Sequence, residues 1–337
     1  MQSGFNPLVA KPSDFIVALG DSFSSGEGAG AYAAWSDHDG DDEDVRNACH
    51  QSANAWIRKT ILPGGDTSSI GARDAARDNS LDFHFLACSG AESENLLPYA
   101  TAGSPVPANG AGGELGRDQW GGMVTQLDAG YLDENTTLVT LSIGGNDVKF
   151  SPILAACATV VGDCSDIVIE DDNGGAYAEA IERLDEELPE TLDTILTQVR
   201  QRAPNALIAL VGYPRLFDIG TSCILVGEQN RNWLNDVSDT MTEVIANAAY
   251  AADTPSKRVI FVDPQAAFQD RTLCSGLDSG GLNGLRFDFT AGDLPFGVPD
   301  GTPNTNPVSQ QSVHPNDVGT SMYADALMNE LIGGVYP

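Results

Sequence analysis

The stretch Ile16-Val17-Ala18-Leu19-Gly20-Asp21-Ser22-Phe23-Ser24-Ser25-Gly26 runs from an apolar segment directly into a Gly-Asp-Ser turn. A continuous apolar run of this kind is typical of a β-strand that is covered on both faces. The turn places the Ser22 hydroxyl at the carboxyl end of that strand, the edge at which open α/β sheets bind ligands. The sequence therefore predicts that Ser22 is a candidate nucleophile. The alternative is a turn serine that caps the next helix.

Four other segments share the apolar and β-branched enrichment of strands. With the first, the predicted strands are Asp14–Leu19, Leu81–Ala87, Thr137–Ile143, Leu207–Val211 and Arg258–Val262. Helical patterns cover Ala48–Thr60, Val124–Tyr131, Tyr177–Arg202, Glu228–Ala252 and Asn316–Ile332. Pro189 predicts a kink or a break within its helix. Because strands alternate with helices, we expect an α/β fold, a flavodoxin-like three-layer α/β/α sandwich around a five-stranded parallel sheet.

No internal repeat or linker divides the 337 residues. We therefore expect an N-terminal extension over 1–13 and one domain over 14–337. Residues 29–44, 103–122 and 275–311 are rich in Gly, Pro, Asp and Asn and are predicted to be long loop insertions. Aromatic residues in or near these loops either line an acyl groove or cover the core: Trp35, Tyr99, Trp120, Phe287, Phe289 and Phe296. The acidic run 37–44 lacks the glycine and glutamate spacing of a calcium-binding EF-hand, which favours a solvated charge run.

The charge balance is strongly acidic, with 17 Lys and Arg against 48 Asp and Glu and a formal net charge of −31. Such a surface repels nucleic-acid phosphates and anionic lipid head groups, so we expect neither as a partner. No apolar run has the length of a bilayer span, and no signal peptide pattern opens the chain. We expect no stable membrane insertion, and a monomer.

The six cysteines are Cys49, Cys88, Cys157, Cys164, Cys223 and Cys274. Neither they nor the four histidines show metal-ligand spacing, so no metal or cofactor is predicted. An even number of cysteines without such spacing favours disulfides and an oxidising compartment. Pairing in sequence order is one of 15 arrangements, and six buried thiols are the alternative.

A serine nucleophile needs a base and donors for an oxyanion. His314 precedes the last helix in Ser312-Val313-His314-Pro315-Asn316, on a short loop that can return to the sheet edge. Gly90 and Asn146 follow the second and third strands, so they reach the same edge as Ser22. The other histidines fit the role of base less well: His84 lies within a strand, His50 follows a cysteine and His38 lies in the acidic run.

The order Ser22, Gly90, Asn146 and His314 resembles the SGNH hydrolase superfamily, also called GDSL esterases and lipases. The surrounding blocks resemble its secreted, disulfide-bearing actinobacterial branch: Gly20-Asp21-Ser22-Phe23-Ser24-Ser25-Gly26-Glu27-Gly28, Ala87-Cys88-Ser89-Gly90-Ala91 and Ser142-Ile143-Gly144-Gly145-Asn146-Asp147. The resemblance extends from Asp14 to Ile332.

This resemblance implies a three-layer α/β/α sandwich and ester hydrolysis through an acyl-serine on Ser22, with His314 as base. It implies an oxyanion hole formed by the Ser22 N–H, the Gly90 N–H and Asn146. It also implies secretion and three disulfides paired in sequence order, Cys49–Cys88, Cys157–Cys164 and Cys223–Cys274.

The chain departs from the family at one position. Gln311 stands three residues before His314, where the family usually has an aspartate. We expect the backbone carbonyl of Ser312 or Gln311 to orient the imidazole instead, with Asp317 and Asp288 as alternatives. A neutral acceptor fixes the tautomer but stabilises the imidazolium less than a carboxylate does.

These features predict a secreted carboxylesterase or lipase that acts on neutral lipids or small acyl esters. The alternatives are a carbohydrate O-acetylesterase and a non-catalytic binding module of a larger surface protein.

Overall fold

A computed structural model describes residues 11–38, 47–64, 66–98, 116–117, 123–159, 162–169, 174–223, 226–253, 258–275, 280–293, 308–332 and 336. Parts of the predicted extension and of the three predicted insertions lie outside these ranges, as do Tyr99, Trp120, Phe296 and residues 39–44 of the acidic run.

A five-stranded parallel sheet in the order β2-β1-β5-β6-β7 forms the centre of the protein. Its strands are β1 (Asp14–Gly20), β2 (Leu81–Phe85), β5 (Leu138–Ser142), β6 (Leu207–Val211) and β7 (Val259–Val262). Each lies within two residues of its predicted bounds. The order is that of a flavodoxin-like sheet, in which the chain reverses direction across the sheet between β1 and β5. Ligands bind at that switch point, so the loops after β1 and β5 lie where a site is expected.

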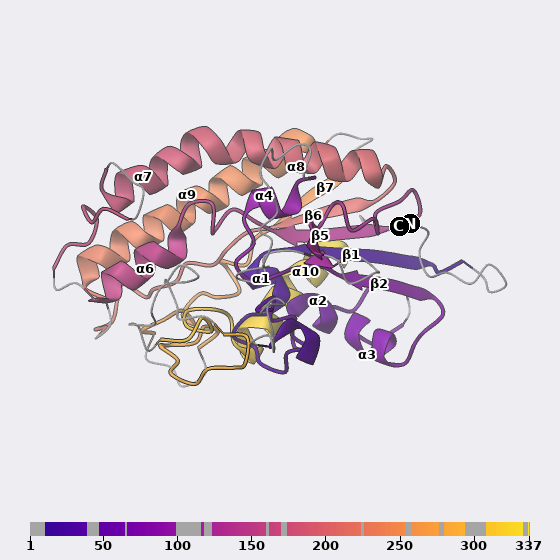
Figure 1. Ribbon diagram of the computed structural model, residues 1–337, viewed down its shortest axis with the longest axis horizontal. Helices are drawn as coiled ribbons and strands as arrows, with labels where there is room; N and C mark the ends of the chain where they lie inside the picture. Colours follow the sequence, from indigo (N-terminus) through magenta and orange to yellow (C-terminus); the bar gives the residue numbers. More distant parts are fainter. Residues whose placement is uncertain are drawn as a thin grey trace.

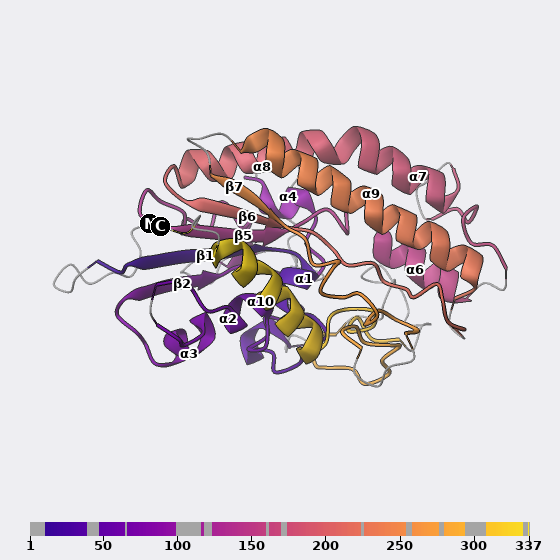
Figure 2. The ribbon, with the colours of Figure 1, turned by 180° about the vertical axis from the view of Figure 1, so that it is seen from behind.

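Helices cover both faces of this sheet, which confirms the three-layer prediction (Figures 1 and 2). One layer holds α4 (Ser93–Leu96), α7 (Ala176–Glu182), α8 (Leu188–Arg202) and α9 (Glu228–Ala252). The other holds α2 (Trp56–Lys59), α3 (Ile70–Ala75) and α10 (Asp317–Ile332). The remaining elements are α1 (Ser22–Ser25), η1 (Ala34–Ser36), α6 (Phe150–Thr159) and an antiparallel pair, β3 (Gly116–Arg117) and β4 (Met123–Val124). The three middle strands are almost wholly buried, as their continuous apolar runs predict.

The predicted helix Tyr177–Arg202 changes its winding ahead of Pro189. A π-helical turn, η3 (Arg183–Glu187), separates α7 from α8. A proline ring clashes with the carbonyl four residues earlier, here that of Asp185 inside the π turn. The wider turn accommodates the proline, so the predicted irregularity is a π turn that connects α7 directly to α8.

The predicted helix Val124–Tyr131 is wrong, because this segment forms turns and bonds largely to neighbouring segments. The Gln126 side-chain amide pairs with the Gly20 backbone, with donor–acceptor distances of 2.8 Å in both directions. The backbone N–H groups of Gln126 and Leu127 donate to the Asn95 and Leu96 carbonyls of α4. The segment therefore braces the end of β1.

Of the predicted helix Ala48–Thr60, only the residues of α2 are helical. The residues before it donate their backbone N–H groups to distant segments: His50 to Ser36, Ser52 to Ser25 and Ala53 to Ala31. These contacts hold the 47–55 segment against the loop that follows Ser22. The predicted helix start at Asn316 is confirmed, since its side chain accepts the Val318 and Gly319 N–H groups at 3.0 Å.

Candidate active site

The turn after β1 is held rigid by the buried carboxylate of Asp21. Gly20 precedes it with a φ of +124°, and a Cβ there would lie 2.4 Å from the Ser142 carbonyl oxygen, so only glycine fits. The Asp21 carboxylate accepts the Phe23 N–H at 3.0 Å and the Ser142 hydroxyl at 2.6 Å. This capping starts α1 at Ser22, which fixes the serine at the strand end.

Tyr213, which follows β6, connects this turn to the loop after β5. Its hydroxyl donates to the second oxygen of Asp21 and accepts the Gly145 N–H at 3.2 Å. Burial raises the pKa of Asp21 to about 6, although these hydrogen bonds oppose the rise. Asp21 and Tyr213 thus hold two neighbouring loops in one arrangement.

Ser22 and His314 meet at this edge, although 292 positions separate them in the sequence. The His314 Nε2 lies 2.8 Å from the Ser22 Oγ, and both residues are buried. On the other side of the ring, Nδ1 lies 3.0 Å from the Ser312 carbonyl oxygen. If the Nδ1–H donates to that carbonyl, Nε2 presents its lone pair to the Ser22 hydroxyl.

The other predicted partners of His314 are engaged elsewhere. Asp317 accepts from Lys59 at 2.6 Å, and Asp288 accepts from Arg286 at 2.8 Å. The Gln311 carbonyl accepts from the Asn283 side chain at 3.2 Å. Ser312 is thus the acceptor that the geometry offers to the imidazole.

Three hydrogen-bond donors surround the Ser22 edge. The Asn146 side chain donates to the Ala91 carbonyl at 2.9 Å, which uses one of its two amide hydrogens and leaves the second. Within the described ranges, no backbone acceptor takes the N–H of Ser22 or of Gly90. Gly90 lies in a turn with a φ of +84°, which glycine adopts readily.

Asp147 joins the two loops that carry these donors. Its carboxylate accepts the Ser93 N–H at 3.1 Å and the Ser93 hydroxyl at 2.5 Å. Together with the Asn146 bond to Ala91, this ties the loop after β5 to the loop after β2. The spacing between Asn146 and Gly90 is thereby fixed.

A pocket opens beside Ser22 between the sheet edge and α9. Asn146 and His314 are among the polar residues that line it. Its lining is otherwise mostly apolar, with Phe23, Phe150, Tyr213, Pro214, Leu216 and Met241. Met241 comes from the buried stripe of α9. A mostly apolar lining with a few polar groups suits an apolar group that carries one reactive polar centre.

Similarity to known proteins identifies the family of this chain. A model of the GDSL-like lipase/acylhydrolase family matches residues 18–321. The chain belongs to this family. Lipase 1 of Streptomyces coelicolor is 30% identical over 266 residues, which cover 78% of this chain and 74% of that one.

Two solved structures share the fold. The extracellular lipase of Streptomyces rimosus is 25% identical with a TM-score of 0.61, and the match covers 93% of this chain and 98% of that one. Phospholipase A1 of Streptomyces albidoflavus gives 25% identity and a TM-score of 0.59 over the same shares. The protein is a carboxylic ester hydrolase of the GDSL lipase and esterase family.

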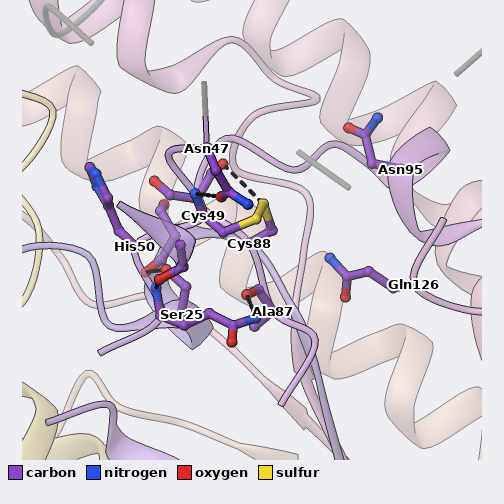
Figure 3. Close-up of a disulfide and its surroundings, with 12 residues drawn as sticks. Ser25, Asn47, Cys49, His50, Ala87, Cys88, Asn95 and Gln126 are labelled. Atoms are coloured by element: carbon purple, nitrogen blue, oxygen red, sulfur yellow. Dashed lines mark hydrogen bonds between the residues drawn. A yellow bond between two sulfur atoms is a disulfide. The ribbon is translucent and has the colours of Figure 1, made fainter. Parts of the chain in front are cut away.

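The six cysteines of this GDSL hydrolase form the pairs that the resemblance implies, Cys49–Cys88, Cys157–Cys164 and Cys223–Cys274. The first ties the 47–55 segment to the end of β2, two residues before Gly90 (Figure 3). The His50 ring points away from the sulfur atoms. The disulfide thus holds the Gly90 turn and the His50 segment together.

His50 belongs to a buried cluster that the sequence analysis missed. Its Nδ1 lies 2.5 Å from a carboxylate oxygen of Glu27, and its Nε2 lies 3.5 Å from Asp37. His84 lies apart from the site, stacked on Tyr131 with a ring separation of 4.1 Å. The sequence held one hint of this cluster, because Glu27 lies within the block around Ser22, but its partner His50 lies 23 residues further on.

The described aromatic residues of the long loops do not line the pocket. Trp35, Phe287 and Phe289 have 46%, 62% and 43% of their surface exposed. Among the residues that the structure describes, no group of three or more His, Cys, Asp or Glu side chains could hold a metal ion. None of the helices in the described ranges is both long and apolar enough to cross a membrane.

Proposed function

We propose that this GDSL hydrolase cleaves carboxylic esters through an acyl-serine on Ser22, with His314 as the base and no carboxylate partner. The observation that carries the proposal is the contact of 2.8 Å between His314 Nε2 and Ser22 Oγ, with Nδ1 held on the Ser312 carbonyl. A nucleophile and base within hydrogen-bond reach, with the base oriented by a third group, are the parts that acyl transfer needs.

In the first step, His314 takes the Ser22 proton while Oγ attacks the ester carbonyl carbon. The carbonyl oxygen becomes an anion that accepts hydrogen bonds from the Ser22 N–H, the Gly90 N–H and Asn146. The tetrahedral intermediate then expels the alcohol, which takes its proton from His314. Water repeats the sequence on the acyl-enzyme and releases the acid.

Burial lowers the pKa of His314 below its usual value, and the Glu27 carboxylate opposes this effect. The imidazole is therefore neutral at pH 7 and can accept the serine proton. A lower pKa also makes the imidazolium of His314 harder to form, so a strongly lowered pKa would slow the reaction. The carbonyl of Ser312 offsets part of that cost.

For the substrate, we propose a neutral lipid or a small acyl ester. The apolar pocket walls suit the acyl group, and the net charge of −31 disfavours anionic lipid surfaces. The relatives are a lipase and a phospholipase A1, which supports ester substrates with acyl chains. A carbohydrate O-acetylesterase is the alternative for substrate class.

The test is hydrolysis of a p-nitrophenyl ester series, from acetate to palmitate, by the native protein, Ser22→Ala and Ser25→Ala. Ser25 is the matched control, since it lies in the same short helix and its hydroxyl donates to the Ser22 carbonyl. The proposal expects turnover that is lost in Ser22→Ala and retained in Ser25→Ala. An optimum at acetate would favour a deacetylase. No turnover by folded native protein would favour a binding module.

We also propose that the protein is secreted. Three disulfides and the extracellular lipase of Streptomyces rimosus among its relatives support this location. Thiol titration of unreduced, denatured protein isolated from culture medium should find no free thiol. Six free thiols in protein isolated from cells would contradict secretion.

A further inference from the structure

Behind the candidate active site lies a fully buried ion pair, Glu27 and His50. Both side chains have 0% of their surface exposed, and Nδ1 lies 2.5 Å from the carboxylate oxygen. Tyr32 stacks on the His50 ring at 4.5 Å and donates its hydroxyl to the other Glu27 oxygen at 3.1 Å. Charges this deep persist only when they are paired and hydrogen-bonded, and these two are.

Both members of the pair are ionised. Burial alone would neutralise His50, but the Glu27 carboxylate and the Asp37 hydrogen bond outweigh burial and raise the pKa of His50 to about 10. Burial likewise disfavours the Glu27 carboxylate, and His50 more than compensates, so the pKa of Glu27 lies below its usual value. Both pKa shifts favour a charged Glu27 carboxylate in the folded protein.

The chain that carries Glu27 packs directly on His314. A Cβ built at the next residue, Gly28, would lie 2.9 Å from the His314 Cβ and 3.0 Å from the Pro315 carbonyl oxygen. The Asn283 side chain donates to the Gly28 carbonyl at 2.8 Å and to the Gln311 carbonyl at 3.2 Å. Glu27 and the His314 loop are thus held in one fixed relation.

Several charged or titratable groups surround this pair. They are Tyr32, Asp37, Asp293 and His314. Within the pair, the Glu27 carboxylate raises the pKa of His314, whereas His50 lowers it to a smaller extent. Glu27 is also the member of the pair whose neighbour, Gly28, packs on His314. Since the Nδ1 partner of His314 is the neutral Ser312 carbonyl, no carboxylate bound to the ring supplies this charge.

We propose that Glu27 is a positioning residue for His314: its buried carboxylate, locked by His50, stabilises the imidazolium in place of an aspartate bound to Nδ1. This role rests on the proposed function, because the imidazolium forms when Ser22 loses its proton. Unlike a triad aspartate, Glu27 acts through space and through the packed Gly28 segment. The Glu27 carboxylate, on another loop, then compensates for the aspartate that is replaced by Gln311.

The test follows His314 itself by NMR, which needs no ester turnover. The chain has four histidines, so ring signals in histidine-labelled protein can be assigned by substitution. In Glu27→Gln the pKa of His314 should fall by about half a unit to one unit. The imidazolium would then be about 3- to 10-fold less favoured, and kcat/KM on an active ester should fall by a similar factor.

Two further variants separate charge from packing. Tyr32→Phe removes a hydrogen bond to Glu27 but leaves the carboxylate, so the pKa of His314 should stay within about 0.2 of native. The double variant Glu27→Gln/His50→Gln replaces the ion pair by two neutral amides, which avoids an unpaired buried charge if Glu27→Gln alone does not fold. The pKa of His314 should fall in this variant too, though by somewhat less than in Glu27→Gln, because the opposing His50 charge is also removed.

An unchanged pKa of His314 in a folded protein without the Glu27 carboxylate would overturn the proposal. So would an equal fall in Tyr32→Phe, because that result assigns the effect to packing. Failure of the proposed function would give a different result from failure of the Glu27 proposal. Native protein would then hydrolyse no ester, while the titration of His314 would still report whether Glu27 acts on it.

Discussion

The Nδ1 of His314 lies 3.0 Å from the carbonyl oxygen of Ser312, two residues earlier in the same loop. The loop thus orients its own histidine through backbone geometry. Val313 between them has a φ of +60°, a strained conformation for a β-branched residue. Asn283 stabilises this conformation by exchanging backbone hydrogen bonds with Val313 and His314 at 3.1 Å and 2.9 Å. The arrangement replaces a side-chain acid by a constrained peptide group.

Gln311→Asp, which introduces the aspartate usual in the family, should not raise activity. The Gln311 side chain is buried and donates to the Asp288 carbonyl, away from the imidazole. The shorter carboxylate would leave that carbonyl without its donor, so the unfolding free energy should fall by about 1–3 kcal/mol. Urea unfolding and kcat, compared with Gln311→Asn, measure this. A tenfold gain in kcat would show that the loop rearranges to form a triad.

Asn146→Ala should lower kcat by about 10²–10³-fold with little change in KM, because an oxyanion donor acts mainly in the transition state. The assay is steady-state kinetics on a soluble p-nitrophenyl ester. Asp147→Asn is the comparison, since it weakens the tie to Ser93 that positions the same loop. A loss confined to KM in Asn146→Ala would contradict its role at the oxyanion.

Activity should persist below the usual titration range of histidine. Burial lowers the pKa of His314, so the neutral base is retained as the pH falls past about 6.5. The profile of kcat/KM on a neutral ester should therefore be flat above that pH and decline only below it. Asp21, with a pKa near 6, titrates in the same range. The decline should remain in Asp21→Asn if His314 causes it, and a decline that begins above pH 7 contradicts this assignment.

Tyr213→Phe should impair both stability and turnover. The hydroxyl joins Asp21 to the Gly145 N–H, so its loss leaves a buried acceptor and a buried donor short of a partner. We expect a loss of about 1–3 kcal/mol in unfolding free energy. The Asn146 loop also loses a fixed contact, so kcat should fall more than KM changes. Native kcat in a destabilised variant would show that the link serves only the fold.

The Glu27–His50 pair should give the protein a distinctive pH dependence of stability. The pKa of His50 is raised in the folded state, so its contribution is fully present below about pH 6.5 and is lost as the pH rises towards 10. His50→Gln should be less stable than native by about 3–5 kcal/mol at pH 6, and the difference should shrink at higher pH. Urea unfolding between pH 6 and 9.5 measures it. A difference that is independent of pH would mean that His50 is not charged in the fold.

The sheet was predictable because its strands are short apolar runs whose period and boundaries depend on local sequence. The start of the last helix at Asn316 was predictable for the same reason, because it depends on local sequence. The predicted helix Val124–Tyr131 failed because Gln126 bonds to the Gly20 backbone, a partner 106 positions away. A pattern in one window cannot reveal a competitor of that kind.

The same distinction applies to the candidate site. Ser22, Gly90 and Asn146 each follow a strand, so the topology of a parallel sheet predicts that they share one edge. No comparable rule of topology predicts the Glu27–His50 pair. Its members lie on irregular segments that long-range contacts bring together, such as the hydrogen bond from the Ser52 N–H to the Ser25 carbonyl. The charge that acts on His314 was therefore visible only in three dimensions.

The most direct test of the account is mass spectrometry of the protein quenched with acid during turnover of a p-nitrophenyl ester. We expect an acyl group on the peptide that carries Ser22, its absence in Ser22→Ala, and its accumulation to a much smaller extent in His314→Ala. An acyl group on another residue, or turnover that continues in Ser22→Ala, would contradict the assignment of Ser22 as the nucleophile.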